Sequence, residues 1–117
     1  METRPNLQKR TFEDVYGLGN IPTNYTGQEY TQTLTPNENN VYVYDCVFHD
    51  CLNTSNGGAL SCGSTVYRLL VEQSSFISCT TSGQYGGGIC FQSRTNGQCV
   101  LSRICGFNCS ATHPNII

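Results

Sequence analysis

The chain has 117 residues, of which 12% are charged, and its formal net charge is -2. This length fits one domain or a fragment of a larger one. Three of its six basic residues lie in the first ten positions, so the remainder has no concentrated basic face and we exclude a nucleic-acid partner. The best apolar run, VYRLLV (66–71), is too short for a transmembrane segment and contains Arg68.

The N-terminal third of the chain differs from the rest. Residues 1–40 contain no cysteine, and METRPNLQKRTFEDVYGLGN (1–20) lacks the apolar core of a signal peptide. No helical apolar stripe is present, and the alternation in YTQTLT (30–35) predicts at most one strand. We expect residues 1–40 to be a loosely ordered arm, or a degenerate cap formed by a first turn of the repeat that follows.

Residues 41–110 have the character of short strands. VYVYDCVF (41–48) alternates and is rich in β-branched and aromatic residues, and RLLVEQSSFISC (68–79) and QCVLSRICGF (98–107) are similar. Turn residues such as Gly, Ser and Asn lie between them, and sustained helical periodicity is missing. The pattern predicts an all-β region over 41–110, followed by a tail at 111–117.

One stretch of this region occurs twice in the same order. FHDCLNTSNGGAL (48–60) returns as FISCTTSGQYGGGI (76–89), and a weaker third copy, ICGFNC, spans 104–109. The matched positions are Phe48 with Phe76, Cys51 with Cys79, Gly57 with Gly86, Gly58 with Gly87, and Leu60 with Ile89. A period of 28–30 residues with several short strands and glycine turns predicts a solenoid of β-coils, whose neighbouring strands pair in parallel about 4.8 Å apart.

These motifs resemble a known repeat. F-x-x-C followed by G-G-A-L, then F-x-x-C followed by G-G-G-I, is similar to the repeats of polymorphic outer-membrane-protein-type surface proteins. In that family F-x-x-N and G-G-A-[ILV] mark coils of a right-handed parallel β-helix of the pectin-lyase-like superfamily, and Cys-rich versions occur in predicted surface proteins of parasitic protists. The resemblance covers residues 41–110, with Cys51 and Cys79 where Asn is usual. It implies two to three coils, or a piece of a longer helix, and a role in adhesion or surface display with no catalytic residues to carry over.

The eight cysteines all lie between Cys46 and Cys109. An even number at this density favours an oxidising compartment, so we expect a cell-surface or extracellular protein whose precursor starts before the residues shown; the alternative is a cytosolic chain with reduced thiols. Matching positions of adjacent coils place Cα atoms within disulfide range, so Cys51 and Cys79 are a candidate disulfide or a stack of buried thiols. Cys105 and Cys109 are close enough in sequence to pair locally.

Metal and cofactor sites are not predicted. The spacings Cys46-x4-Cys51 and Cys105-x3-Cys109 are looser than those of zinc ligands. The glycines at 86–88 lack the lysine and the helix of a phosphate-binding loop.

Acidic residues and sequons complete the candidate sites. Within the last 77 residues (41–117), the only carboxylate side chains are Asp45, Asp50 and Glu72, which we expect to be solvated turn and strand-surface residues. Asp45 and Asp50 would point to opposite faces of an unbroken strand. This is too few for the clustered carboxylates of a polysaccharide lyase or hydrolase, so we expect no catalytic residues. N-glycosylation sequons occur at Asn24, Asn53 and Asn108.

Three functional hypotheses follow. The leading one is a non-enzymatic surface or secreted protein that presents a β-helical face to a host or cell-surface protein or a glycan. The second is a fragment of a carbohydrate-active β-helix enzyme whose catalytic coils lie elsewhere in a parent protein. The third is a small binding module held by disulfides, without a β-helix.

Overall fold

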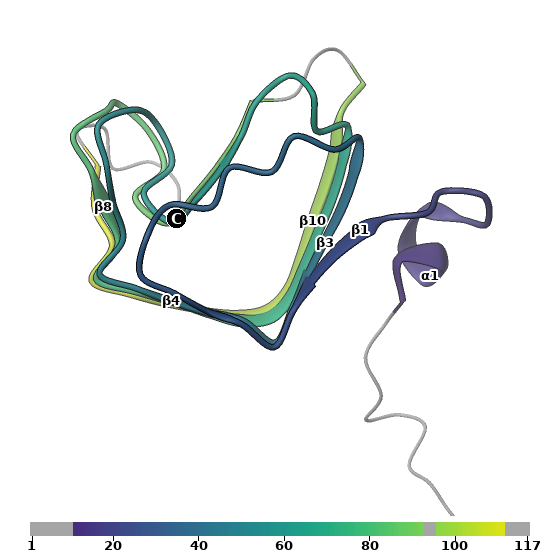
Figure 1. Ribbon diagram of the computed structural model, residues 1–117, viewed down its shortest axis with the longest axis horizontal. Coiled ribbons are helices and arrows are strands. Elements are labelled where there is room, and N and C mark those ends of the chain that lie inside the picture. Colours follow the sequence, from purple (N-terminus) through teal and green to yellow (C-terminus); the bar gives the residue numbers. More distant parts are fainter. Residues whose placement is uncertain (1–10, 93–95, 112–117) are drawn as a thin grey trace, which may run out of the picture.

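A computed structural model describes residues 11–92 and 96–111 of the chain (Figure 1). They are mostly strand, with one short helix. The elements in chain order are α1 (Phe12–Tyr16), β1 (Thr23–Thr26), β2 (Glu29–Tyr30), β3 (Asn40–Tyr44), β4 (Val47–His49), β5 (Leu52–Asn53), β6 (Leu60–Cys62), β7 (Arg68–Ile77), β8 (Thr80–Thr81), β9 (Ile89–Phe91) and β10 (Gln98–Phe107).

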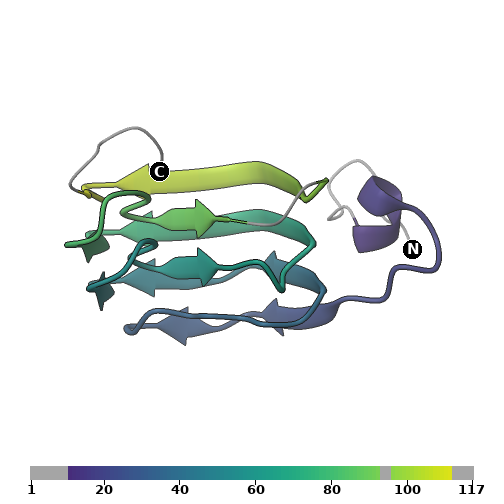
Figure 2. The same ribbon diagram turned by 90° about the horizontal axis from the view of Figure 1, so that it is seen from above.

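The strands form one six-stranded sheet and two small ones, and every strand pair is parallel. β7 lies at the centre of the large sheet, with β3 and β4 along one side and β10 along the other. β1 pairs with the outer side of β3, and β2 pairs with the outer side of β4. β5 pairs with β8 and β6 with β9. The sheet curls around a shared interior, and successive passes of the chain lie one above another (Figure 2). The prediction of a parallel, largely β fold is confirmed.

The strand register follows the sequence repeat. Leu52 pairs with Thr80 at a spacing of 28, and Leu60 with Ile89 at 29. Phe48 pairs with Phe76, and the two rings are stacked with centroids 4.7 Å apart. Burying two such aromatic side chains contributes on the order of 3–6 kcal/mol of hydrophobic free energy.

The strands turn at corners whose residues have positive φ. The first corner passes through Gly27, Asp45, Gln73 and Arg103, and the second through Asp50, Ser78 and Asn108; these residues have φ between 53° and 63°. Each column repeats at the spacing of the strands, and the bends of β7 and β10 lie at the first corner (Figure 1). Asp45 and Asp50 therefore occupy two successive corners, so the unbroken strand assumed for their opposite faces does not exist.

The corners divide the large sheet into two walls. We call β1, β3 and the parts of β7 and β10 before the first corner the first wall, and β2, β4 and the parts after it the second wall. Leu69 and Val71 of the first wall and Phe76 of the second lie in the interior core, which is fully buried there. Leu70, between Leu69 and Val71, points to the outside.

α1 covers the outside of the first wall. Phe12 is buried against Tyr42 and Leu70, and the Tyr16 hydroxyl donates to the carbonyl of Leu69 at 2.6 Å. The helix was not predicted, because five residues are too few for an apolar stripe. A capping box defines it instead: the Thr11 hydroxyl accepts from the Asp14 N–H, and the Asp14 carboxylate accepts from the Thr11 N–H. Within the described ranges, no helix has the length and apolar character needed to span a membrane.

The described part of the predicted N-terminal arm contains α1, β1, β2 and a bridge from Leu34 to Leu60. β1 and β2 stack beneath β3 and β4 at a spacing of 18, whereas the later turns stack at 28–30. This turn is shorter because only three residues lie between Tyr30 and Leu34, and none of them forms a strand equivalent to β5. The domain boundaries at residues 40 and 110 remain predictions.

Candidate binding surface

The repeated glycines hold the loops against their neighbours. A Cβ atom at Gly58 would meet the carbonyl oxygens of Gly87 and Thr80, and one at Gly87 would meet the backbone of Ser110. Gly57 and Gly86 have φ of 86° and 71°, in the region that favours glycine. The glycine motifs therefore maintain the close approach of stacked turns.

The cysteines of the motif form a column in the interior. Cys51 and Cys79 are buried and lie side by side, since the Thr80 N–H donates to the Cys51 carbonyl at 2.9 Å. Cys109 continues the column, because the Ser110 N–H donates to the Cys79 carbonyl at 3.1 Å. All eight cysteines of the chain are thiols in the structure. Burial raises the pKa of the Cys51 thiol to about 12, so it is a poor nucleophile near neutral pH.

Cys105 and Cys109 differ in their surroundings. Cys105 is exposed on β10, whereas Cys109 packs against the core and its thiol donates to the Phe76 carbonyl at 3.3 Å. The Asn108 corner lies between them. The structure therefore separates these two side chains, and their pairing remains a prediction.

The three sequon asparagines are held differently. Asn24 and Asn108 are exposed, on β1 and at a corner respectively. Asn53 is half-buried, and its side-chain amide donates to the carbonyls of Asn56 at 3.3 Å and Gly57 at 3.0 Å. A glycan on Asn53 takes the place of one amide hydrogen and would remove at least one of these bonds in the folded chain, so Asn24 and Asn108 are the better acceptor positions.

Glu72 is not solvated, contrary to expectation. It is fully buried on the outside of the first wall, where the Tyr42 hydroxyl lies 3.3 Å from one carboxylate oxygen and Arg103 lies 3.6 Å from the other. The pKa of Tyr42 is raised, mainly by burial and next by the negative charge of Glu72. Charge pairing and hydrogen bonding thus make the burial of this carboxylate possible.

The outside of the second wall is an exposed face that carries apolar side chains. We call Val47, His49, Ile77 and Phe107 the outer flank. His49, Ile77 and Phe107 occupy one position in successive turns, and Val47 precedes His49 by two residues on β4. Val47 and Ile77 are each 39% exposed and Phe107 is 68% exposed. No described element covers this face, whereas α1 covers the first wall.

The outer flank also carries a charged group. The His49 ring lies between two carboxylates, with Nε2 2.6 Å from Glu29 and Nδ1 2.9 Å from Asp50. Carboxylates only accept hydrogen bonds, so both contacts require the doubly protonated imidazolium. Accordingly the pKa of His49 is raised, most by the hydrogen bond to Asp50 and next by the hydrogen bond to Glu29. Among the described residues no group of three or more His, Cys, Asp or Glu could hold a metal ion.

Apolar surface also lies at the last turn of the stack. A cavity of about 240 Å³ is lined by Tyr85, Gly86, Ile89, Cys90, Phe91, Gln92, Cys99 and Leu101. It lies above β9, over which no further strand is placed in the described part of the chain. The exposure of these side chains depends on which turns cover them, so sequence patterns alone do not reveal the cavity.

No family model matches the chain, and no curated protein or solved structure is significantly similar to it.

Proposed function

We propose that the curled sheet is a short right-handed parallel β-helix, and that the chain is a non-enzymatic surface or secreted protein that uses it for adhesion or display. The parallel registers at 28–30 residues, the two corner columns and the stacked glycine motifs support the β-helix. The right hand rests on physical grounds, because about 98% of crossovers between parallel strands of one sheet have that hand.

The observation that carries the function is the outer flank. A rigid wall holds Val47, Ile77 and Phe107 at fixed spacing, and the charged group around His49 lies beside them. Exposed apolar side chains next to polar groups are typical of surfaces that bind proteins, and aromatic rings also stack on sugar rings. The partner would be a host or cell-surface protein or a glycan.

Binding to intact cells and to an array of glycans tests this proposal. The variant Phe107→Ser removes the most exposed ring of the flank, and Leu18→Ser is its matched control because Leu18 is 83% exposed beyond α1. We expect retention of the wild type and of Leu18→Ser, and at least a tenfold loss for Phe107→Ser. Equal retention of all three proteins, or none, would contradict the proposal. Cleavage of an acidic polysaccharide by the purified chain would instead favour the enzyme hypothesis.

The location is tested by the intact mass of the protein from its native cells. The protein is alkylated without and with reduction, before and after glycan removal. Blocked thiols or attached glycans would support the secretory route. Eight free thiols and an unmodified mass would place the protein in a reducing compartment and remove the main support for surface display.

A further inference from the structure

The stack of turns has an open strand edge at each end. β10 pairs with β7 on one side, and β1 and β2 pair with β3 and β4; no other strand among residues 11–92 and 96–111 pairs with these three. Figure 2 shows β10 at one end of the stack and the first turn at the other. Open edges of this kind are templates for pairing with another chain.

The backbone groups at these two edges point outward. The Gln98 N–H donates to the Tyr67 carbonyl and so points toward β7. Successive N–H groups of a strand point in opposite directions, so those of Cys99 and Leu101 point to the open edge. At the other end, the Gly27 N–H donates to Tyr44, so the N–H groups of Asn24 and Thr26 point away from β3. Each end therefore presents strand donors that pair with no other strand of the described residues.

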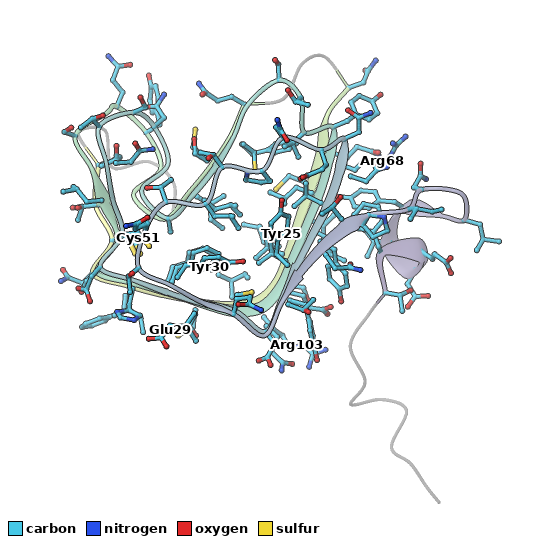
Figure 3. All side chains as sticks on the ribbon, viewed as in Figure 1. Tyr25, Glu29, Tyr30, Cys51, Arg68 and Arg103 are labelled. Carbon is cyan, nitrogen blue, oxygen red and sulfur yellow. The ribbon has the colours of Figure 1, made fainter. Side chains whose placement is uncertain are left out.

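The interior side chains at the two ends are complementary. One interior column runs Tyr25, Val43, Val71, Leu101, and a second runs Tyr30, Phe48, Phe76, Gly106. The first turn thus ends in two tyrosine rings, which point inside the curl in Figure 3. The last turn ends in a leucine that lines the apolar cavity and in a glycine without a side chain.

The ends also differ in charge. The last strand and its corner, residues 98–110, contain a single charged residue, Arg103. Residues 20–39 of the first turn contain only Glu29 and Glu38. If a further turn continued the first corner column, its Gly27 would lie above Arg103 and its Glu29 would lie two residues beyond, although within one chain Arg103 already lies near Glu72 and Glu29 near His49.

We propose that copies of this chain associate end to end, with the β1–β2 edge of one copy pairing in parallel with the β10 edge of the next. Tyr25 of the second copy lies above Leu101 at the mouth of the cavity, and Tyr30 above Gly106. Pairing edge to edge in this way uses different surfaces on the two copies, so it does not close on itself and gives a series of dimers, trimers and longer species. It uses the ends of the stack and does not depend on the outer flank.

The test uses light scattering after size-exclusion chromatography of the full chain with a thiol reductant, over a range of concentrations. Asn24→Pro and Leu101→Pro each remove an outward N–H from one edge, where proline is tolerated. Each variant alone should be monomeric, while the wild type forms concentration-dependent oligomers. An equimolar mixture of the two variants keeps one intact edge of each kind, so it should form a dimer and nothing larger.

Asn24→Ala is the matched control, since it loses the same side chain but keeps the N–H group. It should associate like the wild type. A wild type that stays monomeric at every concentration, or a variant that still forms oligomers alone, would overturn the proposal.

Hydrogen exchange of the wild type covers the case in which a proline variant fails to fold. The outward amides of Asn24, Thr26, Cys99 and Leu101 should gain at least tenfold protection as the concentration rises. Amides of β7, which is paired on both sides already, should not change. Association without added protection at both edges would also overturn the proposal.

Discussion

The rings of Phe48 and Phe76 lie parallel, with their centroids 4.7 Å apart and 3° between their planes. Tyr30 stacks on Phe48 from the first turn at 4.9 Å, so one aromatic column links three successive turns. These contacts join residues that are 18 and 28 positions apart in the chain. The column therefore couples the stability of each turn to that of its neighbour, as expected for stacked repeats.

Removal of a buried ring from this aromatic column should strongly destabilise the fold. Phe76→Ala leaves a cavity between fully buried neighbours and should lower the free energy of unfolding by about 3–5 kcal/mol. Phe107→Ala removes the same ring from an exposed position and should change it by less than about 0.5 kcal/mol. Urea unfolding followed by circular dichroism measures both, and equal effects would argue against a shared interior.

Alanine substitutions at two glycines test how closely the turns are packed. Gly87→Ala places a Cβ atom against the backbone of Ser110 and should destabilise the fold by about 1–3 kcal/mol. Gly63→Ala is the control, because a Cβ atom there meets nothing within 4 Å and φ is not positive. It should be neutral or slightly stabilising in the same urea experiment. A Gly87→Ala protein as stable as Gly63→Ala would show that the turns are not packed this closely.

The sequence repeat predicts the spacing of the turns because packing and sequence share one period. The repeat matches Phe48 with Phe76 and Leu60 with Ile89, and these residues pair in the structure because each turn buries the same kind of side chain. The corners at Gln73 and Arg103 could not be predicted in this way. Neither is glycine, and their positive φ is imposed by the turns stacked around them rather than by local preference.

The first turn was expected only as one of two alternatives for residues 1–40, and the outer flank was not predicted. The first turn has a spacing of 18, so its strands carry no copy of the motif, and stacking beneath β3 and β4 defines them. Ile77 and Phe107 are exposed because α1 packs on the first wall and no described element covers the second. A single turn of helix specified by a capping box gives no periodic signal from which that coverage could be inferred.

The His49 group should make stability depend on pH. Its folded pKa is raised above the ordinary value of about 6.5. Hence its contribution is fully present below about pH 6.5 and is lost as the pH rises through the raised pKa. NMR titration should show the His49 pKa falling in Glu29→Gln and in Asp50→Asn. The effect on thermal stability should be small because the group is exposed, and His49→Gln should remove it. An unchanged His49 pKa in both variants would contradict the ion pairs.

The cysteine column restricts which disulfides can form. Cys79 lies between Cys51 and Cys109, at one strand spacing from each, whereas Cys51 and Cys109 are two spacings, about 9.6 Å, apart. Only neighbours fall within the Cα distance that a disulfide spans. Oxidation of the folded protein should therefore join Cys79 to one of the other two and leave the third free. The raised pKa of Cys51 and of Cys79, due first to burial, should make this reaction slow at neutral pH.

Peptide mapping by mass spectrometry after oxidation identifies the pair. In Cys79→Ser, both Cys51 and Cys109 should remain free within the column, because the central partner is lost. Cys51→Ser should direct the bond to Cys79 and Cys109. A peptide linking Cys51 directly to Cys109 in the folded protein would mean that the turns do not stack in the order β5, β8 and the Ser110 bridge, since this order holds the two residues two strand spacings apart.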